Sequence, residues 1–256
     1  MDRPTSSKLG QYTLGVVAHL LVLLAWYLFV HLGDVPKYVM PSPVDTIKAL
    51  FVADYGWWTN TGVTATEIFG GYAMALGVGV VLALLFTWSK TLEALMLPLL
   101  VTLNMIPKVA LGPLLIVWFK YGVFPNTMMA FSIAVFPILL TTARGLREIE
   151  PDLLDLVRSL HGSRWQLFTK IQLPGALPYV FAGMKVAAIL AVAGAIVGEF
   201  LSSDRGLGYL MLQVQVTLDT PAMFMAVIVI TLLGMALYGL VLLLERLLVP
   251  KDARVS

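Results

Sequence analysis

The feature that most constrains this chain is a set of six long apolar stretches. The hydrocarbon core of a bilayer, about 30 Å thick, is crossed by roughly 20 apolar residues in a helix. The stretches that meet this length are Tyr12–Leu32, Thr64–Trp88, Ala94–Trp118, Pro125–Gly145, Pro178–Leu201 and Met223–Leu247. In lipid a helix satisfies all its own backbone polar groups. The sequence therefore predicts an all-α integral membrane protein with about six transmembrane helices.

Composition agrees with a lipid environment and excludes several classes of function. Hydrophobic residues make up 59% of the chain and charged residues only 12%, unlike a soluble globular domain. Cysteine is absent, so the chain has no disulfides or thiolate metal sites. The net charge of +2 and the lack of a basic stripe give no support to nucleic-acid binding. His19, His31 and His161 are too dispersed in sequence to indicate a metal site.

The third stretch contains three prolines, Pro98, Pro107 and Pro113. Each proline removes a backbone donor and bends a helix. Such breaks are tolerated at membrane depth only where other helices or a water-filled cavity satisfy the freed carbonyls. We therefore expect this helix to be broken and to line a cavity.

The distribution of lysine and arginine predicts the topology. With the N-terminus in the cytoplasm, the cytoplasmic side receives Arg3, Lys8, Lys90, Arg144, Arg147, Arg158, Arg164, Lys170, Arg246, Lys251 and Arg254. The outer side receives Lys37, Lys48, Lys120 and Arg205. The positive-inside rule then places both termini in the cytoplasm. The expected parts are a cytoplasmic segment 1–11, a single transmembrane domain 12–249 and a cytoplasmic tail 250–256. The first stretch has no A-x-A-like cleavage site and is expected to be retained.

The longest loop on the cytoplasmic side, Leu146–Leu177, holds eight of the 32 charged residues. Glu150–Pro151–Asp152 has the pattern of a helix start, with proline and acids in the first turn. Gly162 is placed to end that helix. The sequence thus predicts a short amphipathic helix in the first half of this 146–177 loop.

A second short helix is expected directly afterwards. Ser163 and Gln166 have the spacing of a capping box, and Leu173–Pro174 is expected to stop the helix before the next span. Two amphipathic helices joined by a tight turn can insert apolar side chains into a groove on a partner protein. They can equally lie flat among lipid headgroups.

A family resemblance bears on this choice. The stretch Ser159–Phe168, followed by Ile171-x-Leu173-Pro174, resembles the "EAA" coupling loop of bacterial ABC-importer permeases, in the branch that moves nitrate, taurine, aliphatic sulfonates and pyrimidine vitamin precursors. Further motifs similar to that branch are Met40–Pro43, Pro107–Leu114, Gly198–Phe200 and Gly206–Tyr209.

The chain also departs from the family pattern. The family's Glu-Ala-Ala falls on Asp155-Leu156-Val157, and its usual glycine falls on His161. Asp155 keeps the carboxylate, and the adjacent Gly162 is expected to keep the turn.

The resemblance implies a type I ABC importer permease fold, like that of methionine importers, in a bacterial inner membrane. The permease would work as a pair, with a second copy of itself or a related permease. Each copy would seat its coupling helix in an ATPase subunit, and a periplasmic or lipid-anchored binding protein would deliver the substrate. The chain has no Gly-Lys dipeptide and so no phosphate-binding P-loop. We therefore expect no cofactor on this chain and no enzymatic activity of its own, with ATP bound by the partner.

Two sets of candidate residues follow. The residues expected to couple to the ATPase are Asp155, Arg158, Ser159, His161, Gly162, Ser163, Arg164, Trp165 and Phe168, with Leu160 and Leu167 as packing. Polar groups within spans are costly and often face a cavity or a partner. Those that are candidates for the translocation path are Asn104, Lys108, Ser132, Lys185 and Glu199.

Some of these residues have alternative interpretations. Lys108 could offer its charge to an anion, but Lys108 and Glu199 could also snorkel to water at span ends. Gly162 could act only as a helix cap and Trp165 only as an interfacial anchor. The Gly194-x-x-x-Gly198 spacing permits close approach of two helices.

Two other classes of protein compete with this interpretation. A secondary transporter driven by an ion gradient would be expected to show inverted repeats with paired broken helices, whereas the prolines here concentrate in one stretch. An integral-membrane enzyme would need a nucleophile, a histidine cluster or a close carboxylate pair, and none is evident in the spans. Co-purification of an ATPase would separate the ABC permease from both.

Overall fold

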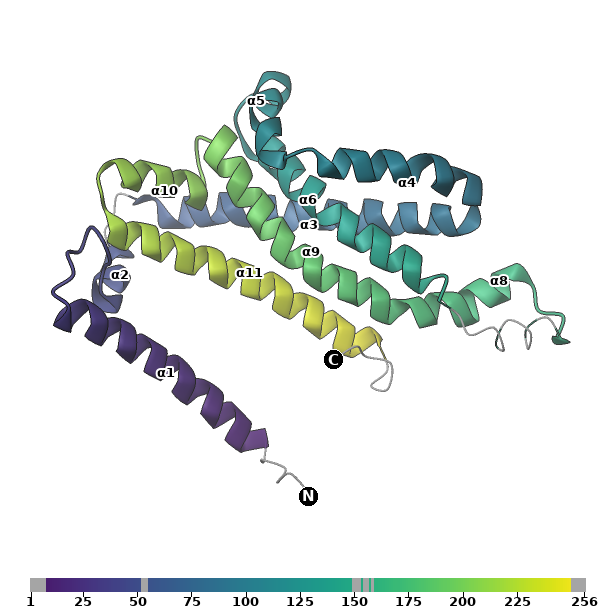
Figure 1. Cartoon of the computed structure of the whole chain (residues 1–256), viewed down its shortest axis with the longest axis horizontal. Helices are drawn as coiled ribbons and strands as arrows, with labels where there is room; N and C mark the ends of the chain where they lie inside the picture. Colours follow the sequence, from purple (N-terminus) through teal and green to yellow (C-terminus); the bar gives the residue numbers. More distant parts are fainter. Residues whose placement is uncertain (1–7, 52–54, 149–152, 154–156, 158, 250–256) are drawn as a thin grey trace. The chain divides into compact units, whose positions relative to one another are not determined.

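A computed structural model describes residues 8–51, 55–148, 153, 157 and 159–249, and no strand occurs among them. The helices that it contains are α1 (Lys8–Leu32), α2 (Pro43–Ala49), α3 (Trp57–Trp88), α4 (Lys90–Met105), α5 (Lys108–Phe119), α6 (Val123–Gly145), α8 (Arg164–Leu167), the π turn η2 (Phe168–Gln172), α9 (Leu173–Ser202), α10 (Leu207–Val216) and α11 (Thr220–Leu248) (Figure 1). The all-α prediction is confirmed.

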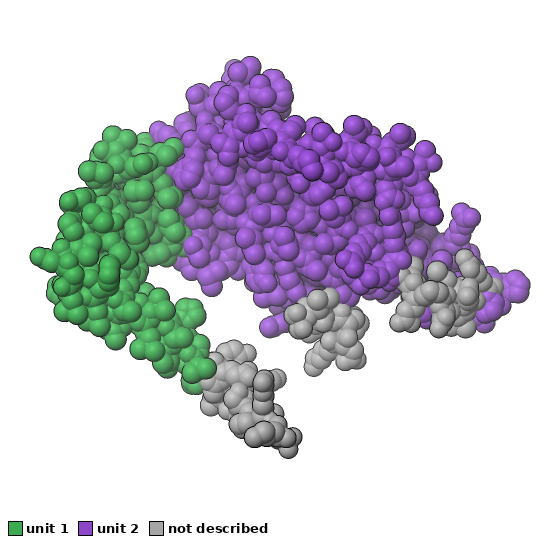
Figure 2. Space-filling model, viewed as in Figure 1, with its two compact units in different colours: residues 1–57, 210–228 green, residues 58–209, 229–256 purple. Residues whose placement is uncertain are grey.

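Five helices in the described part of the chain are long and apolar enough to cross a membrane, and α4 with α5 forms one bent pair that could be a sixth span. These correspond to the six predicted stretches. The chain divides into two compact units, residues 1–57 with 210–228 and residues 58–209 with 229–256 (Figure 2). Each unit is described by itself below.

The predicted break in the third stretch is confirmed, and it lies at Pro107. Helices α4 and α5 meet there at 94°. Ile106 has the extended backbone that a residue before proline favours, with ψ of 124°. Pro98 and Pro113 lie inside α4 and α5 without ending them.

A lysine side chain compensates for this break. The Lys108 ammonium donates hydrogen bonds to the carbonyls of Leu103, at 3.1 Å, and of Asn104, at 3.4 Å. These are the acceptors that the backbone N–H groups of residues 107 and 108 would use in a continuous helix. Lys108 therefore caps the end of α4, donating to the Asn104 carbonyl and sharing the Leu103 carbonyl with the Ile106 N–H, which lies 3.3 Å from it.

The core of the larger unit is built on close contact between α6 and α9. A methyl group added to Gly194 would lie 2.7 Å from the Cα of Ala130, and one added to Gly198 would lie 2.9 Å from the Cα of Asn126. Helix α3 approaches the same surface, because a methyl group on Gly71 would lie 2.5 Å from the Cβ of Ala130. Small residues thus let three helix backbones meet. The close approach expected at Gly194 and Gly198 is confirmed.

In the smaller unit, the Met40–Pro43 motif forms the start of α2. Ser42 is the N-cap and accepts a hydrogen bond from the backbone N–H of Asp45 at 3.1 Å, with Pro43 at the first helical position. The Ser42 hydroxyl donates back to the Asp45 carboxylate at 2.8 Å, and Lys37 pairs with it at 3.2 Å. The Ser42 hydrogen bond, aided by Lys37 and opposed by desolvation, lowers the pKa of Asp45.

Candidate functional site

The 146–177 loop contains a tight turn at His161 that ends a helical segment. The backbone N–H of Gly162 donates to the carbonyl of Val157 at 2.8 Å, five residues earlier, as in a Schellman motif. The left-handed residue of this motif is His161, with φ of 53°. Gly162 lies in the turn as expected, but the left-handed backbone conformation falls on His161 and not on Gly162. The signal was in the sequence, because the family's glycine falls on position 161.

Gly162 is needed at this turn for space. A methyl group placed on it would lie 2.6 Å from the Cγ1 of Val157 and 3.2 Å from the Val157 carbonyl oxygen. Both distances are shorter than ordinary contacts, so a side chain here would push the turn open. His161 thus supplies the left-handed backbone conformation and Gly162 supplies the space, two properties that a single glycine could combine.

The predicted capping box is confirmed. The backbone N–H of Gln166 donates to the Ser163 hydroxyl at 3.2 Å, and the Gln166 side chain accepts from the backbone N–H of Ser163 at 2.8 Å. This reciprocal pair satisfies two donors at the start of α8.

The predicted stop at Leu173–Pro174 is wrong. From α8 the helix continues through η2 into α9, and the whole of Arg164–Ser202 forms one helical run of 39 residues. In α geometry the ring of Pro174 would clash with the carbonyl of Lys170. The wider π turn directly before α9 changes the position of these carbonyls. The proline is thus accommodated inside a continuous helical run.

Aromatic side chains connect the capped turn to the body of the larger unit. Phe168 is 8% exposed and packs in a cluster with Phe86, Leu146 and Ala176. Its ring lies 5.7 Å from that of Trp88, edge to face, and 5.8 Å from that of Trp165. Trp165 itself is 66% exposed. The residues that line a pocket of about 540 Å³ beside these rings are Thr87, Trp88, Arg164, Trp165, Leu167, Phe168 and Gln172.

The structure places most of the predicted coupling residues on one continuous, accessible segment. Those that are exposed are Ser159, His161, Gly162, Ser163, Arg164 and Trp165. Phe168, which is buried, anchors the segment. Asp155 and Arg158, and the helix start expected at residues 150–152, lie outside the described residues. The arrangement is suited to docking, with an exposed indole and guanidinium on a rigidly capped turn.

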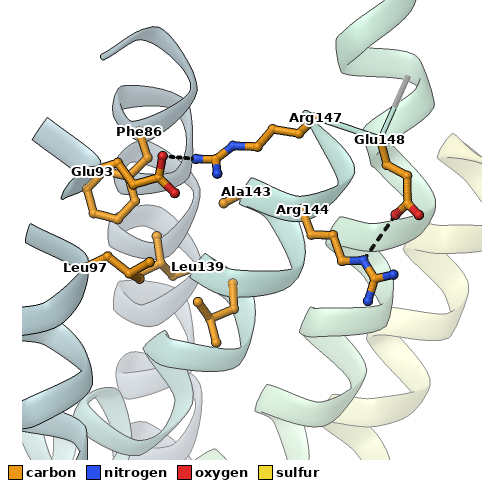
Figure 3. A pocket seen from close by; sticks show the side chains of 9 residues that line it. Phe86, Glu93, Leu97, Leu139, Ala143, Arg144, Arg147 and Glu148 are labelled. Atoms are coloured by element: carbon orange, nitrogen blue, oxygen red, sulfur yellow. Dashed lines mark hydrogen bonds and ion pairs between the residues drawn. The ribbon is translucent and has the colours of Figure 1, made fainter. Parts of the chain in front are cut away.

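A second pocket lies where α6 leads into the 146–177 loop (Figure 3). Its apolar wall includes Leu97 and Leu139, and its volume is about 370 Å³. At its edge the Arg147 guanidinium pairs with Glu93 of α4 at 2.6 Å. Arg144 pairs with Glu148, four residues away on its own segment, at 3.2 Å. Hydrogen bonds from Tyr179 and from Arg144 lower the pKa of Glu148.

At the opposite end of α9, the two glycine-containing motifs meet around a buried carboxylate. Glu199 is 1% exposed and accepts hydrogen bonds from the Thr64 hydroxyl at 2.5 Å and from the backbone N–H groups of Gly208 and Tyr209. It therefore caps the start of α10. Gly206, with φ of 113°, leaves no space for a side chain against this carboxylate.

The buried polar cluster extends from Glu199 to the neighbouring helices. The Asn126 amide donates to Glu67 at 2.8 Å and accepts from the Ser202 hydroxyl at 2.8 Å. No sequence motif singled out Thr64, Glu67 or Asn126. The only signal was that each is a polar residue in or beside a predicted span.

The candidate translocation residues do not share a single set of contacts. Asn104 and Lys108 lie at the break between α4 and α5, where Lys108 caps α4. The Ser132 hydroxyl donates to the carbonyl of Met129 in its own helix at 2.9 Å. Lys185 forms an ion pair with Glu245 of α11 at 2.9 Å. Glu199 belongs to the buried cluster. Their expected role in the translocation path stays a prediction.

The all-helical architecture, with several spans and an exposed, capped turn between two of them, defines a multi-pass membrane transport subunit. The chain belongs to the family of binding-protein-dependent transport system inner membrane components, whose family model matches residues 75–250. It is thus a permease subunit of an ABC importer, a transport component and not an enzyme.

Relatives among known proteins are similar over most of their length. A probable ABC transporter permease protein of Haemophilus influenzae is 35% identical, covering 85% of this chain and 89% of the relative. The riboflavin transport system permease protein RibX of Chloroflexus aurantiacus is 34% identical, covering 93% and 89%. The formylaminopyrimidine transport permease protein ThiX of Halalkalibacterium halodurans is 29% identical, covering 90% and 92%.

The fold also matches a solved structure. The MetNI methionine ABC transporter in an inward-facing conformation contains a chain that matches 76% of this chain and 96% of its own length, with a TM-score of 0.53 and 20% identity. The type I importer fold expected from the sequence is thereby confirmed.

Proposed function

We propose that this permease forms the translocation path for a small anion or a heteroaromatic vitamin precursor, in a bacterial inner membrane, with both termini in the cytoplasm. The relatives named for riboflavin and formylaminopyrimidine transport support the heteroaromatic class. The excess of lysine and arginine on one side supports the orientation. The permease works as a pair with a second copy or a related permease, receives substrate from a binding protein and binds no ATP itself.

The observation that carries the coupling role is the capped turn at residues 159–168. Trp165 and Arg164 are exposed on this turn, whereas Phe168 is buried in the apolar cluster with Phe86, Leu146 and Ala176. A turn held at its base and exposed at its tip can enter a groove on an ATPase subunit. ATP binding and hydrolysis then move the ATPase subunits, and the turn carries that displacement into the membrane helices.

The test uses the complete transporter in lipid vesicles. The chain is co-expressed with the ATPase and binding protein encoded beside it, and ATP hydrolysis is measured with the binding protein empty and loaded. Gly162→Pro removes the hydrogen bond to Val157, and Arg164→Glu reverses an exposed charge on the turn. Both variants are expected to lose stimulation by the loaded binding protein while the permease still folds. Lys120→Glu, another exposed charge reversal, is the control.

Substrate class is read from the same vesicles. Binding protein loaded with riboflavin, a formylaminopyrimidine, taurine or nitrate is compared for stimulation and uptake. Stimulation by none of the four would reject the proposed classes. If no ATPase associates with the wild-type chain and both variants still transport, energy coupling by ATP is rejected and an ion-driven mechanism is favoured.

A further inference from the structure

Both described ends of the 146–177 loop contact the same short turn between α3 and α4. At one end Arg147 pairs with Glu93, as Figure 3 shows. At the other end Phe168 meets the ring of Trp88. Trp88 and Glu93 lie only five residues apart, at the end of α3 and in the first turn of α4. The loop therefore leaves α6 and enters α9 against one common element, which we call the receiving turn, Trp88–Glu93.

The receiving turn is itself firmly built. Ser89 is the N-cap of α4, and its hydroxyl accepts a hydrogen bond from the backbone N–H of Leu92 at 3.2 Å. The Ser89 N–H donates to the carbonyl of Leu85 at 3.0 Å, which joins the turn to α3. A turn held in this way transmits a displacement instead of absorbing it.

Packing extends this connection along α4. The cluster that buries Phe168 includes partly buried Leu92, Met96 and Leu100, which lie on one side of α4. No residue of α4 is fully buried, so this apolar face is the surface through which α4 contacts the cluster. A shift of Phe168 would act on α4 through these side chains, and the far end of α4 is the break at Pro107.

We propose that the receiving turn takes up the motion of the coupling loop and passes it through α4 to the break at Pro107. The inference rests on the proposed function, since it assumes that an ATPase moves the 159–168 turn. Trp88, Glu93 and Arg147 are thus positioning residues that act through Phe168 and α4, with no contact to substrate or ATP required of them.

The pocket in Figure 3 also supplies a matched control. Arg144 and Glu148 form an ion pair at the same edge, yet both lie on the α6 side and are four residues apart. Breaking this pair, which is longer and more exposed than the Arg147–Glu93 pair, removes an arginine–glutamate contact at the same pocket without releasing α4.

The experiment compares single and double variants of the complete transporter in vesicles. Glu93→Arg and Arg147→Glu each place like charges together, and the double variant restores an opposite pair. Trp88→Ala removes the ring contact with Phe168, and Trp88→Phe keeps an aromatic group there. Arg144→Glu is the control. The readouts are co-purification of the ATPase, basal hydrolysis, and stimulation by loaded binding protein.

The single variants Glu93→Arg, Arg147→Glu and Trp88→Ala are expected to retain the ATPase and basal hydrolysis but to lose stimulation by about fivefold or more, within the usual range of coupling between sites. The double charge variant and Trp88→Phe are expected to recover stimulation, and Arg144→Glu to keep it. Unchanged stimulation in the single variants would overturn the inference. So would loss of the ATPase together with basal hydrolysis, which indicates a purely structural role. If the wild-type chain binds no ATPase, the proposed function fails and this inference fails with it.

Discussion

At position 161 the chain holds a histidine in a backbone conformation that glycine adopts most readily, with φ of 53°. The next residue is a glycine whose φ is ordinary but whose missing side chain makes room for Val157. In the sequence alone, Gly162 is the only glycine at this turn, so both the left-handed backbone and the space for Val157 would be assigned to it. The structure separates them, and substitutions can therefore address backbone strain and space one at a time.

We expect His161→Gly to stabilise the turn by about 1 kcal/mol, because a side chain in the left-handed region costs about that much. Gly162→Ala is expected to destabilise it through overlap with Val157. Amide hydrogen exchange at position 162, whose N–H donates to the Val157 carbonyl, measures both effects. Exchange is expected to be slower in His161→Gly and faster in Gly162→Ala. His161→Ala keeps the strain and serves as the control. Faster exchange in His161→Gly would contradict this account of the turn.

At the scale of whole elements, the break between α4 and α5 combines a proline with a lysine that completes its hydrogen bonding. Lys108 donates to the carbonyls of Leu103 and Asn104. The same ammonium was a candidate for attracting an anionic substrate. The two roles make different demands, because capping needs a donor within reach of α4, whereas substrate attraction needs a charge open to the pathway.

The variant Lys108→Met is expected to destabilise the permease by about 0.5–1.5 kcal/mol, the usual net contribution of a hydrogen bond, because both acceptors are exposed and the Leu103 carbonyl keeps the Ile106 N–H. Lys108→Arg keeps donors at this position and should lose less. Thermal unfolding of the purified proteins in detergent checks whether the melting temperature falls more in Lys108→Met than in Lys108→Arg. If Lys108→Met unfolds like the wild type while uptake of an anionic substrate falls, the capping role is wrong and the substrate role is supported.

Several elements could be predicted from the sequence because their signals are local. The proline break and the Ser163–Gln166 capping box each depend on residues within a few positions of one another. The π turn before Pro174 could not be predicted, since proline is usually taken as a stop and its accommodation depends on the wider turn preceding it. The contact between Trp88 and Phe168 joins residues 80 positions apart, and nothing in either segment indicates the other.

In the larger unit as a whole, α9 is the helix to which the other elements are joined, by close backbone contact with α6 and by a buried polar cluster. Gly194 and Gly198 bring α9 against the backbone of α6, and Glu199 and Ser202 join it to a buried polar cluster with Asn126. Periodicity could predict the glycine contact but not the partner helix. Likewise, the buried location of Glu199 depends on the backbone donors of the following turn, so snorkelling at a span end was equally compatible with the sequence.

Gly198→Val is expected to lower stability by about 1–3 kcal/mol or more, the range seen when a packed interior is overfilled. The added side chain would meet the Cα of Asn126 at 2.9 Å and separate α6 from α9. Gly77→Val provides the comparison, since a methyl group there meets nothing within 4 Å. Thermal unfolding of both variants in the same detergent decides the matter. Equal melting temperatures would show that α6 and α9 are not in such close contact.

The π turn at Phe168–Gln172 also has a consequence for chain length. A single π turn is equivalent to an α-helix into which one residue has been inserted, and the helical faces before and after it keep the alignment of the shorter helix. A one-residue deletion that restores a regular α-helix here would also restore the clash of the Pro174 ring with the preceding turn, so it requires a residue other than proline at position 174. The spacing between the capped turn and the following span and the presence of a proline at the start of α9 are thus linked: the extra residue of the π turn and Pro174 are expected to be gained or lost together.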